Sequence, residues 1–330
     1  MTESKSRQGA GNTWDRQIND SGEFVRKATT FRDRIRADGS SPYPAEAGRY
    51  HLYVSYACPW AHRTLITRAL KGLQEVISFD VVDHLLGSDG WTFQQQLDGA
   101  TGDSVHGFDL LREVYTKSAP DFDGTVTVPV LYDKQTGQIV NNESAEIIRM
   151  LNSEFQALAG NPGLDLYPED LRDRIDELND WIYPKINNGV YRAGFAQKQA
   201  AYSEAVQSVF EGLDRVERIL SGSRYLCGDR FTEADVRLVT TLMRFDPVYL
   251  THFRCNIRRL VEYPNTWAYT REIYQMPGVA DTVNLAHIKH HYFESHRHIN
   301  PFGIVPDGPD LDFEAPHGRG ARAPERSAQA

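Results

Sequence analysis

A short segment around residue 58 constrains the fold of this chain more than any other. The β-rich run 50–56 leads into Cys58, and Pro59 follows directly. Proline is favoured at the first position of a helix because its missing N–H would have no partner there. The order of strand, cysteine, proline and helix therefore predicts that Cys58 caps a helix. The unpaired N–H groups and the positive end of the helix dipole at such a site favour a thiolate, so we expect a lowered thiol pKa.

The thiol chemistry available at this turn is that of a single cysteine. The residue three positions after Cys58 is Ala61, so no disulfide can form within the turn. The alternative role is that of a buried cysteine acting as a small hydrophobic residue, which the succession of strand, Pro59 and amphipathic helix disfavours. Cys227 and Cys255 fall in helix-periodic sequence and are interpreted as packing thiols. Three cysteines are too few for a disulfide framework, and an odd number cannot all pair, so we expect reduced thiols.

Composition limits the partners and the location. A formal net charge of −9 gives no basic footprint for nucleic acid or for an anionic membrane surface. The N-terminal residues contain no apolar signal region, and no apolar run approaches membrane-spanning length. With 330 residues, 40% of them hydrophobic, two globular domains are the better expectation. These observations predict a cytoplasmic protein with no nucleic-acid or membrane partner.

Residues 49–156 are predicted to form one α/β domain that follows an N-terminal arm, 1–48. Its elements are expected in the order βαβ, long loop, ββα, with strands near 50–56, 76–82, 126–132 and 138–140, one helix after Cys58 and another from Asn142. The segment 84–124 is rich in Gly, Asp and Ser and is expected to be an inserted loop. Pro129 cannot donate to a β-ladder, so it should lie at an edge or follow a cis bond.

Residues 170–298 are predicted to form an all-helical domain. Apolar residues repeat with helical period over 171–182 and 206–220, and strand signals are nearly absent. Thr232 followed by Asp235 has the form of a capping box at a helix start. Residues 299–330 are expected to be a partly disordered extension, because their Pro and Gly content rises.

Several motifs together identify a family. They lie at 21–24 with 31–32, and at 56–63, 90–93, 127–131, 141–149 and 300–306. In this combination the chain resembles the Xi-class glutathione transferases, which are glutathionyl-hydroquinone reductases, over about 21–319. The resemblance implies the glutathione transferase fold, which is an α/β thioredoxin-like N-terminal domain plus an all-α C-terminal domain, in a homodimer. Two positions depart from the family, Tyr132 where tryptophan is expected and Thr125 where a basic residue is common.

The resemblance also implies a glutathione site. Ser144 and the adjoining helix N-terminus would hold the γ-glutamyl carboxylate, and Glu143 would pair with its ammonium; the alternative is an ordinary helix cap. The main chain of Val128 would bind the cysteinyl unit in the manner of an added strand. Trp91 would lie against glutathione, or would simply anchor the long loop.

Tyr191 and Tyr292 match the family positions that contact the hydroquinone ring, where a phenol can hydrogen-bond a substrate hydroxyl. The implied reaction begins with attack of the Cys58 thiolate on the thioether sulfur of a glutathionyl-hydroquinone. A second glutathione then resolves the mixed disulfide. Glutathione is the co-substrate, and no metal, flavin or nucleotide is called for. The alternatives are an Omega-like thiol transferase or dehydroascorbate reductase, and a scaffold without catalysis.

Two groups of residues are expected to lie outside the reacting centre. His62 and Arg63 are expected to face partly toward solvent. A set of five histidines near the last helix suggests a metal site: His287, His290, His291, His296 and His298. Glu294 is the only nearby carboxylate in the sequence and completes no clear ligand pattern, so we interpret the set as a solvated or interface helix end.

Overall fold

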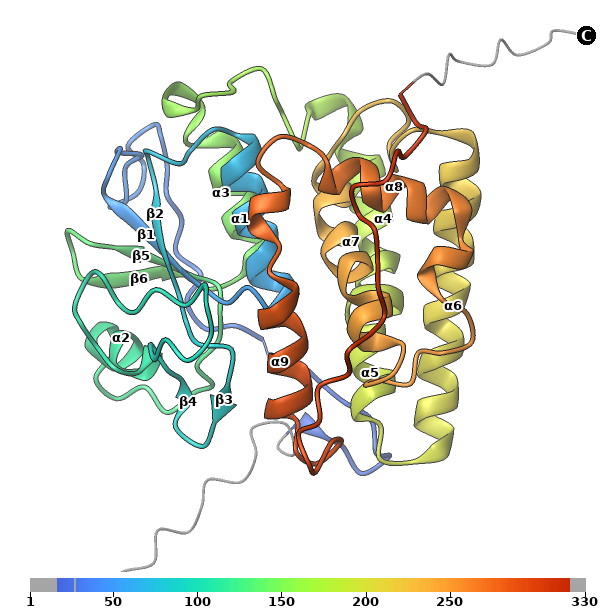
Figure 1. The fold of residues 1–330 in the computed structure, drawn as a ribbon. Coiled ribbons are helices and arrows are strands. Elements are labelled where there is room, and N and C mark those ends of the chain that lie inside the picture. Colours follow the sequence, from blue (N-terminus) through green and yellow to red (C-terminus); the bar gives the residue numbers. More distant parts are fainter. Residues whose placement is uncertain (1–16, 27, 321–330) are drawn as a thin grey trace, which may run out of the picture.

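The computed structural model describes residues 17–26 and 28–320 (Figure 1). The first part of the predicted arm, 1–16, and the end of the predicted tail, 321–330, lie outside the described residues. The described chain forms an α/β domain and a helical domain that lie side by side (Figure 1).

A mixed four-stranded sheet of order β2-β1-β5-β6 is the centre of the N-terminal domain. Strand β1 (Tyr50–Val54) pairs in parallel with β2 (Ser78–Val81) and antiparallel with β5 (Val130–Asp133), which forms a hairpin with β6 (Gln138–Asn141). Every residue of β1 is buried, as expected for a strand covered on both faces. The helices α1 (Pro59–Leu70) and α3 (Ser144–Ser153) pack together between the sheet and the helical domain (Figure 1).

The C-terminal domain is all-helical. Its helices are α4 (Arg172–Ile182), α5 (Gly189–Phe195), α6 (Gln199–Gly222), α7 (Glu233–Arg244), α8 (Pro264–Tyr274) and α9 (Leu285–Ser295). Two π-helical segments, Tyr183–Asn187 and Phe245–Tyr249, continue α4 and α7. Single 3-10 turns occur at Gln156–Leu158, Glu169–Leu171, Leu260–Glu262 and Ala280–Thr282. Together the two domains confirm the predicted α/β thioredoxin-like plus all-α architecture.

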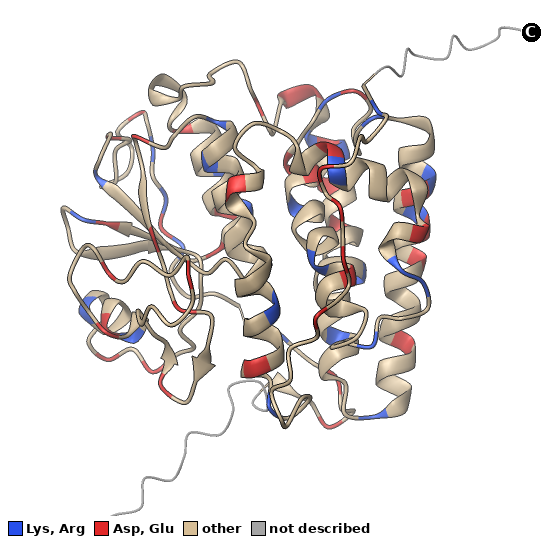
Figure 2. Ribbon diagram, in the orientation of Figure 1, with Lys and Arg blue, Asp and Glu red and all other residues tan. Residues whose placement is uncertain are grey.

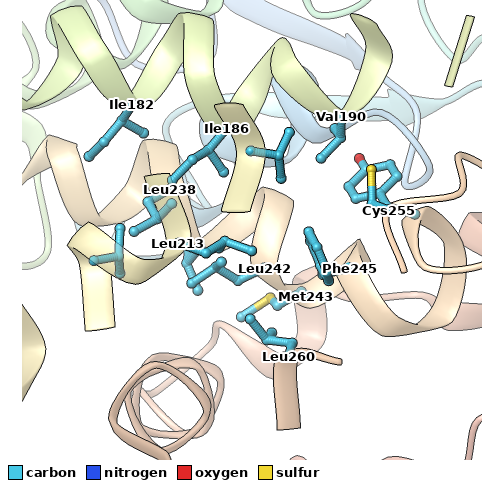
Figure 3. Packing of buried hydrophobic residues seen from close by; sticks show 14 of the residues in the cluster. Ile182, Ile186, Val190, Leu213, Leu238, Leu242, Met243, Phe245, Cys255 and Leu260 are labelled. Carbon is cyan, nitrogen blue, oxygen red and sulfur yellow. The ribbon is translucent and has the colours of Figure 1, made fainter. Parts of the chain in front are cut away.

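Long apolar side chains from α4 to α7 fill the core of the helical domain (Figure 3). Cys255 lies in this core without solvent exposure, in agreement with its predicted packing role. The predicted capping box at the start of α7 is also confirmed, because the backbone N–H of Thr232 donates to the Asp235 carboxylate at 2.8 Å. Cys227 is half-buried, and its sulfur accepts a hydrogen bond from the Thr232 hydroxyl at 3.7 Å.

The prediction of a single long loop over 84–124 is only partly right. The segment contains a short hairpin with two residues in each strand, β3 (Leu86–Gly87) and β4 (Gly90–Trp91), and it contains the helix α2 (Leu111–Ser118). Buried carboxylates order the remainder, since Asp80 accepts the backbone N–H of Ser104 at 2.6 Å. Because Asp80 and Ser104 are 24 positions apart, no local sequence pattern predicts this hydrogen bond.

The described parts of both chain ends pack on the body of the protein. Phe24 of the arm is buried against Tyr191 and Phe195. The C-terminal extension runs along the helical domain (Figure 1), where buried Arg319 pairs with Glu272 at 3.0 Å. The described part of the predicted extension, 299–320, therefore packs on the helical domain through buried Phe313 and Arg319.

Basic and acidic residues are interspersed along the helices and loops of both domains (Figure 2). Within the described residues, no helix combines the length and the apolar character needed to cross a membrane.

Candidate active site

Cys58 is the N-cap of α1, as predicted, and Pro59 is the first helical residue. The half-buried thiol donates to the carbonyl oxygen of Val128 at 3.5 Å. The Val128–Pro129 peptide bond is cis, one of the two predicted arrangements. The thiol thus lies where α1 begins, opposite the backbone that leads into β5.

A cavity of about 350 Å³ opens beside Cys58 between the two domains. Five of the seven predicted site residues line it: Cys58, Trp91, Val128, Tyr191 and Tyr292. The other two, Glu143 and Ser144, do not line it, although their neighbour Asn142 does. The cavity walls therefore bring together a thiol, aromatic rings and phenol groups from both domains.

The tyrosine hydroxyls form a buried chain. The hydroxyl oxygens of Tyr191 and Tyr292 lie 2.6 Å apart, and that of Tyr249 lies 3.1 Å from Tyr292. Burial raises the pKa of Tyr191 to about 12 and holds the pKa values of Tyr292 and Tyr249 well above the ordinary value. All three phenols are therefore protonated at neutral pH, and the pair at the cavity can donate hydrogen bonds. Tyr249 is not predicted from the sequence, because it carries no motif of its own.

Trp91 is held against the last helix of the chain. Its ring, from β4, stacks on the ring of His291 from α9 with the centroids 5.0 Å apart, and both rings line the cavity. Burial lowers the pKa of His291 to about 4, so the ring is neutral, and its Nδ1 lies 2.7 Å from the carbonyl oxygen of His84. This packing anchors Trp91, the alternative role expected for it, while the residue still lines the cavity.

Glu143 and Ser144 occupy the start of α3. Glu143 accepts the backbone N–H of Ala145 at 3.2 Å, which makes it the N-cap of the helix, and its other oxygen accepts the Thr29 hydroxyl at 3.3 Å. The Ser144 hydroxyl accepts a hydrogen bond from Arg63 at 3.4 Å. The helix-cap alternative is thus present, and Thr29 of the arm joins Glu143 to the cavity wall.

The expectation that His62 and Arg63 face solvent is wrong, because both side chains are buried. The periodicity of α1 indicates one buried face, whereas this helix packs on α3 of its own domain and also on α7 of the second. His62 Nδ1 lies 3.0 Å from an Arg244 N–H group and Nε2 lies 2.8 Å from the Thr282 hydroxyl. Because arginine only donates, Nδ1 is the acceptor, and burial keeps the pKa of this neutral histidine well below its usual value.

Arg244 fixes the loop that presents the thiol. Its guanidinium donates to the carbonyl oxygens of Ala57 at 2.8 Å and Tyr56 at 2.7 Å, from α7 of the other domain. A buried arginine with several acceptors holds its partners in a fixed geometry. The sequence offered no local signal for this contact, because the partners are more than 180 positions apart.

Burial raises the pKa of the Cys58 thiol, which corrects the predicted direction. The N–H groups of Ala61 and Trp60 and the positive charges of Arg26 and Arg244 each favour the thiolate, as the helix-end argument requires. The loss of water around the sulfur outweighs them in the ligand-free site. Arg26 reaches this region from the arm, with its guanidinium 4.5 Å over the Trp60 ring.

We therefore expect alkylation of Cys58 by iodoacetamide in ligand-free protein to show an inflection above about pH 8.5, the value of a free thiol. Replacing Arg26 by alanine should move the inflection higher, because a charge that stabilises the thiolate is lost. Mass spectrometry of the Cys58 peptide, sampled over time at each pH, separates this thiol from Cys227 and Cys255. An inflection below the free value would mean that burial does not dominate.

Comparison with known proteins identifies the class to which this site belongs. Residues 57–154 match the glutathione S-transferase N-terminal domain, and residues 199–272 match the glutathione S-transferase C-terminal domain. The chain is 54% identical to the glutathionyl-hydroquinone reductase YqjG of Escherichia coli, over 94% of this chain and 96% of that protein. It is 49% identical to the glutathionyl-hydroquinone reductase PcpF of Sphingobium chlorophenolicum, over 87% of this chain and 90% of that protein.

Solved structures agree. The glutathione-bound structure of YqjG from Escherichia coli K-12 matches with a TM-score of 0.86 at 55% identity, over 88% of this chain and 96% of that one. A Xi-class glutathione transferase from Natrialba magadii matches with a TM-score of 0.86 at 53% identity, over 88% and 89% of the two chains. The chain belongs to the glutathione S-transferase family and, within it, to the Xi-class glutathionyl-hydroquinone reductases.

Proposed function

We propose that this protein is a glutathione-dependent enzyme that reduces glutathionyl-hydroquinones to hydroquinones, with Cys58 as its nucleophile. The observation that carries the proposal is the shared cavity, where the thiol of Cys58 and the hydroxyl pair of Tyr191 and Tyr292 face the same space from different domains. One end of such a site suits the sulfur of the substrate, and the other end suits the ring oxygens.

The glutathione half of the substrate is proposed to lie along the N-terminal domain. The backbone of Val128 would bind the cysteinyl unit, and the ring of Trp91 would pack against the tripeptide. Glu143 would pair with the γ-glutamyl ammonium, while Ser144 and the N-terminus of α3 would hold its carboxylate. The hydrogen bond between Thr29 and Glu143 supports this placement, because it brings the carboxylate to the edge of the cavity.

In the first chemical step the Cys58 thiolate attacks the thioether sulfur. A disulfide bond forms between Cys58 and glutathione, and the bond between sulfur and the ring carbon breaks. The electron pair stays with the ring carbon, which takes up one proton to give the hydroquinone. The protonated phenols of Tyr191 and Tyr292 would donate to the ring oxygen on which charge develops.

In the second step the thiolate of a second glutathione attacks the glutathione sulfur of the mixed disulfide. Oxidised glutathione leaves, and the Cys58 thiolate is restored. The two electrons that reduce the ring thus come from two thiols, so glutathione is the only co-substrate.

Assay of the purified protein with a glutathionylated hydroquinone and with dehydroascorbate, each in the presence of glutathione, tests this function. We expect turnover of the hydroquinone conjugate that depends on Cys58 and exceeds turnover of dehydroascorbate. Preference for dehydroascorbate would favour an Omega-like activity, and no turnover of either compound would favour a scaffold.

Glu143→Ala and Ser144→Ala are each expected to raise the KM for the glutathione conjugate more than they lower kcat. The reason is that these groups grip a part of the substrate that does not change during the reaction. Steady-state kinetics provides the measurement. Glu146→Ala is the matched control, because this residue lies on the same helix but pairs with Arg32 at 2.6 Å. A fall in kcat at constant KM would contradict the binding role.

We also propose a cytoplasmic homodimer. The free state of Cys58, Cys227 and Cys255 suits a reducing compartment, and the dimer, joined through the helical domain, is what the resemblance to the Xi class implies.

A further inference from the structure

A second cluster of chemically reactive side chains lies outside the proposed reaction. His84, which precedes β3, meets His290 and Glu294 of α9. The Glu294 carboxylate oxygen Oε2 lies 3.0 Å from His84 Nε2 and 3.2 Å from His290 Nδ1. The three ligand atoms all lie within 4.8 Å of one another. Ligand atoms on one tetrahedral zinc ion lie roughly 3.3 Å apart, because each bond is about 2.0 Å long, so only small side-chain movements separate this cluster from a coordination shell.

A buried carboxylate stands behind the His84 ring. Oδ1 of Asp83 lies 2.5 Å from His84 Nδ1, and the Asp83 side chain has no solvent exposure. This contact is not a hydrogen bond, and both atoms are buried without a hydrogen-bond partner among the described residues. A small rotation of the His84 ring would convert it into the carboxylate–histidine hydrogen bond that orients a metal ligand. The other oxygen of Asp83 accepts the backbone N–H of Gln96 at 2.8 Å, which fixes the carboxylate in place.

The charges of the cluster call for a cation. Among the described residues, the ion pairs of Asp83 and Glu294 involve only histidines. The two carboxylates converge on the His84 ring from its two nitrogen atoms without a lysine or arginine partner in the described part of the chain, so a divalent ion held at this ring would be attracted by both. The side chains of His290 and Glu294 are 37% and 27% exposed, so an ion can enter from solvent.

We propose that His84, His290 and Glu294 bind one zinc ion, with water in the fourth position. Two imidazole nitrogens and one carboxylate oxygen form a ligand set typical of zinc. The site does not depend on the proposed reductase function. This proposal replaces the expectation of no metal. The sequence near α9 does not reveal the third ligand, because His84 is more than 200 positions away from Glu294.

The ion would join the two domains beside the active site. His84 belongs to the N-terminal domain, and its carbonyl oxygen lies 2.7 Å from Nδ1 of His291, which lines the substrate cavity on α9. A metal bound only by the folded chain stabilises it. Zinc should therefore raise the melting temperature of the protein.

Calorimetric titration of chelator-treated, full-length protein with zinc chloride tests the proposal, together with thermal melts with and without zinc. We expect one zinc ion per chain and a higher melting temperature in the wild type. His290→Ala and Glu294→Gln should each weaken binding at least about tenfold and remove the thermal shift. Both side chains are partly exposed, so we expect both variants to fold, and circular dichroism verifies that they do.

Two matched variants make the result decisive. Cys58→Ala removes the active-site thiol as a competing zinc ligand, and His298→Ala removes an exposed histidine just beyond α9 that is outside the cluster. Both should bind zinc as the wild type does. Three results would each overturn the proposal: no saturable zinc binding by the wild type, wild-type affinity for zinc in His290→Ala and Glu294→Gln, or loss of zinc binding in Cys58→Ala.

Discussion

Replacing Cys58 by alanine is expected to lower the turnover of glutathionyl-hydroquinones by at least about a thousandfold, because among the described residues that line the cavity Cys58 is the one cysteine. The fold should be unaffected, since the thiol is only half-buried and its hydrogen bond to the Val128 carbonyl oxygen is long, at 3.5 Å. Steady-state assays and circular dichroism measure the two effects separately.

Two further variants define the reason for the loss. Cys58→Ser keeps the size of the side chain but should be nearly as inactive, because an alcohol without a base does not attack sulfur at neutral pH. Cys227→Ala should retain full activity, since this half-buried thiol lies in the helical domain away from the cavity. Activity above a few per cent in Cys58→Ala would rule out the covalent mechanism.

Tyr191→Phe and Tyr292→Phe are each expected to lower kcat for glutathionyl-hydroquinones by about ten- to a hundredfold, the effect of one lost donor at a developing charge. The same variants should exchange thiols with a small glutathione mixed disulfide almost normally, because that substrate has no ring oxygen. Comparing kcat for the two substrates isolates the aromatic end of the site.

Tyr249→Phe is the control that the structure provides. Its hydroxyl contacts that of Tyr292 at 3.1 Å, but the residue does not line the cavity, so we expect a smaller loss of kcat. Equal losses on both substrates in Tyr191→Phe and Tyr292→Phe would show that these hydroxyls support the fold or the glutathione site instead of the ring.

The parts of the site that the sequence predicts are those with local causes. Pro59 after Cys58 specifies a helix start within a few residues, and the structure has that start. The capping box at Thr232 is equally local. Tyr191 and Tyr292 are distant in sequence, and only the family resemblance predicts that they lie in one site. The structure has both residues lining one cavity.

Contacts between distant parts of the chain are what the sequence could not reveal. Arg244 and His84 gain their roles from partners in the other domain, and Tyr249 gains its role from Tyr292 within the helical domain. Nothing in the neighbouring residues marks these three positions. The burial of His62 and Arg63 has the same origin, because helical periodicity shows how apolar residues alternate but not how many faces a second domain covers. The direction of the thiol pKa has the same explanation, since the helix end is a local feature whereas Cys58 packs against the apolar clusters of both domains.

Incubating the protein with a glutathionyl-hydroquinone in the absence of free glutathione tests the central claim most directly. Under these conditions the reaction should stop after one step. We expect intact-mass and peptide mass spectrometry to show one glutathione on Cys58, with one equivalent of hydroquinone released per chain and oxidised glutathione formed only after glutathione is added. Release of hydroquinone without an adduct, or adducts spread evenly over Cys58, Cys227 and Cys255, would contradict the account.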